Sequence, residues 1–177
     1  MVIKRTSQIG EKVIRQKSNI VKDVSGREVR RIIKDLTDSM RRTNLVGMAA
    51  PQIGKNLRIF VTEIRQTTYR KNLSKSDPLK VFINPRIIWR SKKQTAGYEG
   101  CGSVASAGLF GLVKRPLSVI CEAIDENGRL FRIKASGLLA RVIQHENDHL
   151  NGVVFIDRVD DTKTLMDRES YIGSKKK

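Results

Sequence analysis

Apolar residues between positions 25 and 42 follow the spacing of one face of an α-helix. They are Val29, Ile32, Ile33, Leu36 and Met40. Just before them, Ser25 and Glu28 have the S-x-x-E spacing of a capping box, in which the serine side chain caps the first turn. The pattern predicts an amphipathic helix over residues 27–42 with Ser25 as its cap.

The predicted strands are short runs rich in β-branched residues and bounded by turn residues. They span residues 57–64, 81–83, 86–89, 117–124 and 130–134. The last two flank Asp125-Glu126-Asn127-Gly128, so they are expected to pair as an antiparallel hairpin. Residues 65–79 are polar and basic, which predicts a solvated loop.

A second helix is predicted over residues 138–150, with Ser136 as its cap and Gly152 ending it in the left-handed conformation. The segment 100–111 is rich in Gly, Ala and Ser, which indicates backbone packed closely against a neighbour. From Asp160 onward only a weak helix is expected. Because the helices are separated from runs of strands, the pattern favours an α+β fold, with residues 1–177 forming one domain.

The chain is strongly basic, since 35 Lys and Arg against 18 Asp and Glu in 177 residues give a formal charge of +17. Such a charge favours binding to polyanions such as ribosomal RNA. Alternatively, it only keeps the protein soluble. Aromatic residues make up only 5% and no RNA-recognition motif is present, so sequence-specific nucleic-acid binding is not expected. Ribosome association through the basic surface is therefore one hypothesis for the charge.

No apolar run approaches the roughly 20 residues of a membrane span, so no membrane association is predicted. The basic N-terminus lacks the apolar segment of a secretory signal, which leaves a short organellar transit peptide as the alternative to the cytoplasm. Cys101 and Cys121 share no repeated spacing, so they are expected to be unpaired thiols in a reducing, cytoplasmic compartment.

The residues His145-Glu146-Asn147-Asp148-His149 match H-E-x-x-H, in which two imidazoles stand one helical turn apart. They include the only two histidines of the chain. At about 100° per residue, Glu146 falls in the middle of the apolar helix face, where an unpaired carboxylate is costly. A divalent metal on both imidazoles, with Glu146 as general base toward a water molecule, explains the pattern. A buried hydrogen-bond cluster of His and Glu is the alternative.

Two imidazoles make a weak metal site, because catalytic sites usually have three protein ligands. No further histidine exists, and Glu169 lies in the tail. Cys101 is the better third ligand, since the glycines on either side of it let the backbone approach a metal. An ordinary buried cysteine is equally compatible with its sequence. Cys121, inside a predicted strand, is expected to be such a buried cysteine.

Three segments resemble, in order and spacing, the motifs of the peptide deformylase family, which are G-φ-G-φ-A-A-x-Q, E-G-C-φ-S and H-E-x-D-H, with φ apolar. The segments are residues 47–52, 99–103 and 144–152. Residues 8–10 and 155–157 are also similar to the start and end of that family, so the resemblance covers nearly the whole chain. It implies mostly antiparallel strands wrapped around the central metal-binding helix.

The activity implied by the resemblance is removal of the N-formyl group from the N-terminal methionine of newly synthesised polypeptides, with release of formate. Cys101, His145 and His149 would hold one divalent ion, most often Fe2+, with Zn2+, Ni2+ or Co2+ as alternatives. Glu146 would exchange protons with the attacking water and the departing amine. The side chain of Gln52 and the N–H of Gly102 would donate hydrogen bonds to the developing oxyanion.

Other residues of the motifs are expected to contact the substrate or support the metal ligands. The expected substrate contacts are Val46, Gly47, Glu99 and Gly100. Val46, Tyr98 and Leu139 are suggested for the methionine pocket, with core packing as the alternative. Glu99 is also expected to receive backbone N–H groups or to orient the cysteine loop, and Asp148 to hold a cationic or backbone neighbour.

Three positions depart from the family pattern. Leu45 stands where the family usually has its first glycine, Gly102 replaces an apolar residue, and Ala105 stands where proline is usual. In addition, no arginine occurs between Cys101 and Lys114. The departures leave two alternatives to the implied activity, namely a hydrolase of altered N-acyl specificity and a weakly catalytic protein that binds metal or the ribosome.

Overall fold

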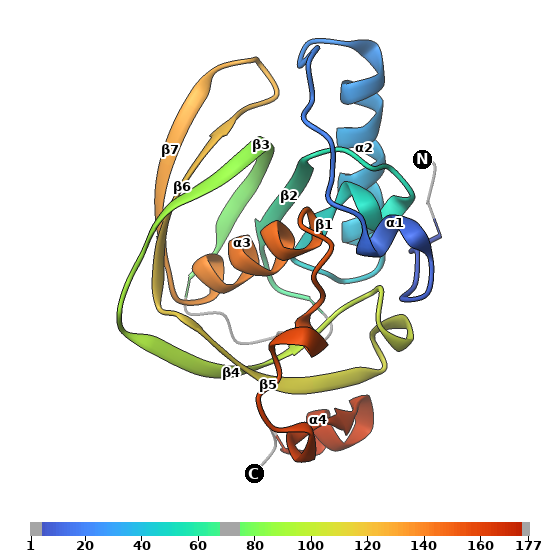
Figure 1. Cartoon of the computed structure of the whole chain (residues 1–177), viewed down its shortest axis with the longest axis vertical. Helices are drawn as coiled ribbons and strands as arrows, with labels where there is room; N and C mark the ends of the chain where they lie inside the picture. Colours follow the sequence, from blue (N-terminus) through green and yellow to red (C-terminus); the bar gives the residue numbers. More distant parts are fainter. Residues whose placement is uncertain (1–4, 68–74, 175–177) are drawn as a thin grey trace.

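Two antiparallel sheets surround helix α3 in the computed structural model, which describes residues 5–67 and 75–174 (Figure 1). The larger sheet has the strand order β1-β2-β3-β6-β7 and the smaller one β4-β5-β8. The strands are β1 (Gly47–Ala49), β2 (Ile59–Ile64), β3 (Asp77–Arg90), β4 (Gln94–Gly100), β5 (Leu109–Pro116), β6 (Ser118–Ile124), β7 (Leu130–Ser136) and β8 (Met166–Asp167). The helices are α1 (Lys12–Arg15), α2 (Arg27–Arg42), α3 (Gly137–His149) and α4 (Arg168–Ser174). Short 3-10 helices are η1 (Ala50–Ile53), η2 (Ala105–Ala107), η3 (Phe155–Arg158) and η4 (Thr162–Thr164).

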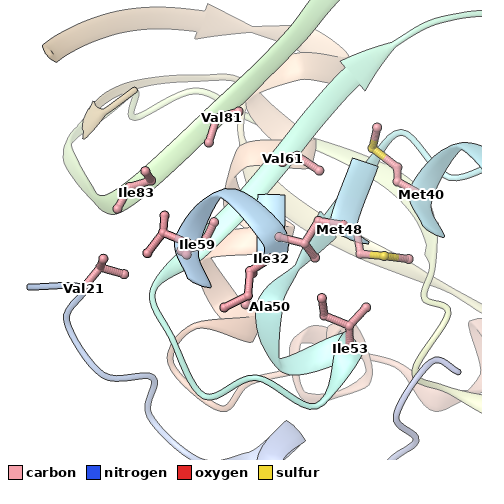
Figure 2. Close-up of a cluster of buried hydrophobic side chains, with 12 residues drawn as sticks. Val21, Ile32, Met40, Met48, Ala50, Ile53, Ile59, Val61, Val81 and Ile83 are labelled. Atoms are coloured by element: carbon pink, nitrogen blue, oxygen red, sulfur yellow. The ribbon is translucent and has the colours of Figure 1, made fainter. Parts of the chain in front are cut away.

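The larger sheet is buried on both faces at β2, because a helix covers each face there. Side chains alternate along a strand, so Ile59 and Val61 of β2 point to one face and Phe60 to the other. Ile59 and Val61 pack with Ile32 and Met40 of α2, as Figure 2 shows. Phe60 packs in the cluster that contains Ala140, Ile143 and Leu150. The alternation therefore places α2 and α3 on opposite faces of this sheet.

Helix α3 is buried on its other side as well, between the larger sheet and the β4–β5 pair (Figure 1). Gln144, Asn147 and Asp148, all polar, are less than a tenth exposed. The expected α+β fold of mostly antiparallel strands around a central helix is confirmed. Within the described residues, no helix has the length and apolarity needed to cross a membrane.

The predicted helix over residues 27–42 and the predicted hairpin are confirmed. The helix is α2, and β6 and β7 pair with Ile124 opposite Leu130 around Gly128, whose φ is +80°. The predicted strand over residues 57–64 is observed as β2. The two predicted pieces around Asn84 form one strand, β3, because Asn84 adopts a φ of +53° at a register shift and exchanges hydrogen bonds with Val21.

Of the two predicted serine caps, the one at Ser25 is wrong, whereas Ser136 occupies the cap position of α3. Helix α2 begins after Gly26, and the hydroxyl of Ser25 bonds Asp23 instead of the helix. Ser136 does precede α3, but its side chain makes no capping hydrogen bond. The prediction for Gly152 holds, since its φ is +73° just beyond α3.

The sequence pattern missed four strands, β1, β4, β5 and β8. Strand β4 contains small residues such as Ala96 and Gly97 instead of alternating apolar ones, and β8 is two residues long. The close packing expected over residues 100–111 is observed at both of its end glycines, which lie against Phe110 and against Leu165 and Val159. Of the predicted loop over residues 65–79, positions 68–74 lie outside the described residues and positions 77–79 belong to β3.

Candidate metal centre

The structure brings Cys101, His145 and His149 together. One ligand atom from each lies within 4.8 Å of the others, and the Cys101 Sγ is 3.1 Å from the His149 Nε2. The imidazoles project from neighbouring turns of α3, with ring centroids 5.1 Å apart, while the thiol comes from the segment after β4. Cys101 is 48 positions from His149 and 44 from His145, and it reaches both because β4 passes alongside the helix.

Glu99 fixes the orientation of the His145 ring. Its Oε2 lies 2.9 Å from the His145 Nδ1, so the ring N–H is assigned to Nδ1 and the Nε2 lone pair is left for a ligand. Burial alone would lower the pKa of His145, but the contacts with Cys101 and Glu99 raise it above its ordinary value. A carboxylate behind a histidine is the usual support of a metal-binding imidazole.

The thiol of Cys101 is 2% exposed and surrounded by donors. The Gln52 Nε2 lies 3.6 Å and the Ser103 N 3.4 Å from its sulfur. Burial alone would raise the pKa of Cys101, but the neighbouring imidazoles hold it well below its ordinary value. The surroundings therefore favour the thiolate, which is the form that binds metal ions.

Glu146 is 4% exposed, and its Oε2 has no hydrogen-bond partner among the described residues. Burial raises the pKa of Glu146 to about 7. Gly47 lies directly against this carboxylate, since a methyl group there would be 2.5 Å from the Glu146 Oε1 and 2.7 Å from the Val142 Cγ1. The absence of a side chain at Gly47 therefore leaves room for the Glu146 carboxylate.

Gln52 is held by its own oxygen. The Gln52 Oε1 accepts a 2.8 Å hydrogen bond from the Ala49 N, which turns the amide NH2 toward Cys101. Gly102 lies beside it, and no acceptor for the Gly102 N–H is found in the described part of the chain. Leu45 covers Gly102, because a methyl group on Gly102 would lie 3.3 Å from the Leu45 Cδ1. Both expected oxyanion donors are thus beside the thiol.

A buried arginine network behind the ligands was missed by the sequence analysis. Arg115, 5% exposed, donates two hydrogen bonds of 2.8 and 2.9 Å to Glu99 and one of 2.6 Å to Asp148. Arg141 donates to Glu99 at 2.7 Å, and Arg158 donates to Asp148 at 2.9 Å. Only the spacing of Arg141, one helical turn before His145, gave a signal in the sequence.

This network changes the expected role of Glu99. Burial alone would raise the pKa of Glu99, but Arg115 and His145 hold it well below its ordinary range. Both oxygens of Glu99 face Arg115, Arg141 or His145, and no backbone N–H of the described residues donates to them. Asp148, as expected, holds cationic neighbours.

The residues suggested for substrate contacts fall into two groups. Val46 packs in an apolar cluster with Ile64 and Val142, and Leu139 borders that cluster. Gly100 instead lies under Phe110, because a methyl group there would be 2.6 Å from that ring. Tyr98 packs on the Tyr171 ring of α4, with centroids 5.7 Å apart. Gly100 and Tyr98 therefore support the packing of the C-terminal segment.

A divalent ion fits this group of residues. The set offers one thiolate and two imidazoles, which suit first-row divalent metals. In addition, the tautomer of His145 is fixed by a carboxylate, and the buried Glu146 has an oxygen without a partner. An ion at the ligand atoms would place a positive charge near the Glu146 carboxylate. This charge would compensate for the free-energy cost of burying the carboxylate away from water.

Both the sequence and the fold of the chain are similar to those of known proteins. The family model described as polypeptide deformylase matches residues 3–165. A peptide deformylase of Thermomicrobium roseum is 41% identical over 167 residues, which cover 93% of this chain and 90% of that protein. The structure of a peptide deformylase from Synechococcus elongatus in complex with actinonin has a TM-score of 0.78 at 37% identity, covering 90% of this chain and 80% of that one. A Met-Ala-Ser-bound class I type b peptide deformylase from Acinetobacter baumannii has a TM-score of 0.84 at 27% identity, covering 89% and 99%.

Proposed function

The chain belongs to the polypeptide deformylase family and is an enzyme that removes the N-formyl group from newly synthesised polypeptides, and we propose that Cys101, His145 and His149 hold its divalent metal ion. The convergence of the three ligand atoms within 4.8 Å is the observation that carries the proposal. Fe2+ is the proposed ion, since a thiolate and two imidazoles suit it, as they also suit Zn2+, Ni2+ and Co2+.

When bound, the ion supplies Lewis acidity toward the formyl oxygen and toward a water molecule. Glu146 is the general base of the proposed mechanism. Its carboxylate accepts a proton from the attacking water and then delivers that proton to the departing amine nitrogen. A pKa of about 7 suits both steps, because the group can hold and release a proton near neutral pH.

Gln52 and Gly102 are proposed to stabilise the developing oxyanion. The Gln52 amide is already oriented by the Ala49 N–H, so it needs no rearrangement to donate from its NH2. The Gly102 N–H adds a second donor close to this amide, since a methyl group on Gly102 would lie 3.9 Å from the Gln52 Nε2. Because neither group titrates near neutral pH, both donate throughout the reaction.

The methionine side chain is proposed to pack against the apolar cluster of Val46, Ile64 and Val142. This cluster adjoins Gly47, which touches Glu146, so a side chain held there would bring its formyl group to the general base. The Acinetobacter baumannii relative was solved with Met-Ala-Ser bound, which supports recognition of a peptide that begins with methionine.

Formate release from a formyl-Met tripeptide tests the mechanism. Protein prepared anaerobically and loaded in parallel with Fe2+, Ni2+ or Zn2+ ranks the metals. Glu146→Gln should retain the metal and lose turnover by at least about a hundredfold, since a general base contributes that much or more. Glu126→Gln, an exposed turn position, is the matched control. Near-native turnover by a metal-loaded Glu146→Gln protein would exclude the general-base role.

We further propose that the enzyme acts in the cytoplasm and meets its substrates at the ribosome. Both cysteines are free thiols, which suits a reducing compartment. A formal charge of +17 would attract ribosomal RNA, and the family match over residues 3–165 supports one catalytic domain across the chain. Ribosome affinity should then fall steeply with salt, and an affinity that salt does not change would contradict this partner.

A further inference from the structure

A polar cavity lies on the side of α3 that faces away from Glu146. It has a volume of about 240 Å³ and is lined by side chains of α3, β3 and β5 and by Arg158. Four of the lining residues are cations, namely Arg90, Lys114, Arg115 and Arg158. We call this space the basic cavity and ask what it would bind.

Not all of this positive charge is neutralised within the protein. Asp148 is the acidic residue of the lining, and it is already engaged by Arg115 and Arg158. Lys114 lies 3.4 Å from Asp160, and that pair is largely exposed. Arg90 forms no ion pair or side-chain hydrogen bond with any residue that the structure describes. The lining therefore has more cationic donors than acceptors.

Asn147 provides an independent sign of a ligand. Its side chain lines the basic cavity and is 8% exposed, yet the amide forms no hydrogen bond with the described residues. The neighbouring Gln144, in contrast, donates to the Pro116 and Ala140 carbonyls. Buried amides are normally hydrogen-bonded, since an unpaired one loses its hydration without replacement. An acceptor inside the cavity would satisfy the Asn147 NH2.

We propose that the basic cavity binds a phosphate group. Phosphate has several acceptor oxygens and negative charge, so it matches guanidinium donors and an amide donor together. The volume is below the 300–1,000 Å³ that is usual for larger organic ligands, which favours a compact anion. The phosphate can be free inorganic phosphate or part of an RNA backbone, and both present the same oxygens.

Arg90 provides the sharpest test, because it is exposed and has no structural partner that its loss would disrupt. Inorganic phosphate is titrated into the Ni2+-loaded protein by calorimetry. Arg90→Gln should weaken binding about tenfold, since a hydrogen bond to a charged group is lost. Asn147→Ala should weaken it as well. Arg86→Gln is the matched control, because Arg86 is exposed on the same strand but outside the cavity lining.

A short single-stranded RNA distinguishes the two phosphate sources. RNA binding that Arg90→Gln weakens and inorganic phosphate displaces assigns the cavity to a backbone phosphate, whereas phosphate binding alone assigns it to the free ion. Absence of phosphate binding at millimolar concentration, or binding that Arg86→Gln weakens as much as Arg90→Gln, overturns the proposal. Glu146→Gln should bind phosphate with unchanged affinity. The phosphate site and the proposed catalytic mechanism are therefore tested independently of each other.

Discussion

Replacement of Arg115 by methionine tests whether the buried network stabilises the fold around the metal ligands. The substitution keeps much of the side-chain volume and removes one charge and three hydrogen bonds. Glu99 would retain Arg141 and His145, but with less compensation for a carboxylate that is almost fully buried. Breaking a buried ion pair in this way costs about 3–5 kcal/mol, since the remaining charge stays away from water.

The matched control is Arg132→Met, which removes an exposed arginine from an ion pair with Glu122. That side chain is 65% exposed, so its loss should cost less than about 1 kcal/mol. For a chain of this length, each kcal/mol shifts the unfolding midpoint by about 2–4 °C. We therefore expect Arg115→Met to lower the Tm by about 6–20 °C and the control by less than about 4 °C.

Thermal unfolding followed by circular dichroism, at equal metal loading, measures both shifts. Metal affinity gives a second readout, because a supporting residue behind a metal-binding histidine typically changes affinity by about 10–100-fold. If Arg115→Met lowered the Tm no more than Arg132→Met, the network would not stabilise the fold and the reasoning from burial would be refuted.

Three further experiments test the packing at the site and one ion pair of the fold. Gly47→Ala should cost about 1–3 kcal/mol and reduce formate release, because its methyl group overlaps Glu146; full activity with an unchanged Tm would contradict this. Gly102→Leu should reduce kcat/KM, and adding Leu45→Gly should recover part of the loss; simple additivity in this double-mutant cycle would show that the two positions do not share space. Hydrogen bonds from arginine lower the pKa of Glu63, so its ion pair stabilises the fold above pH 4.5, the ordinary value, and this contribution is lost as the pH falls through the lowered pKa. The difference in Tm between the native protein and Glu63→Gln should therefore shrink in acid, and a constant difference would count against the pair.

Local patterns predicted the elements that carry their own signal. Helix α2 and the β6–β7 hairpin follow from spacing within one segment, and so does the pairing of His145 with His149 on one helix. Strand β4 has no such signal, since it is recognised by its pairing with β5 and not by its own residues. The predicted cap at Ser25 failed because a short hydroxyl side chain has competing local partners, and here that partner is Asp23.

The candidate site divides in the same way. Spacing on α3 suggested the two imidazoles and Glu146, but the third ligand stayed ambiguous until family motifs were considered. The support for Glu99 could not be predicted, because Arg115 and Arg141 approach it from 16 and 42 positions away. Such pairs depend on the arrangement of β4, β5 and α3 in space, and spacing within one element carries no information about it.

The origin of the three ligand atoms in two layers of the molecule has a kinetic consequence. Both imidazoles belong to α3, which packs on the larger sheet, whereas the thiol follows β4 of the smaller one. An ion shared by these atoms would leave only when the layers part or the cysteine segment swings away. Its residence time would then be governed by the opening of the protein, and extraction by a strong chelator would proceed at a rate independent of the chelator concentration.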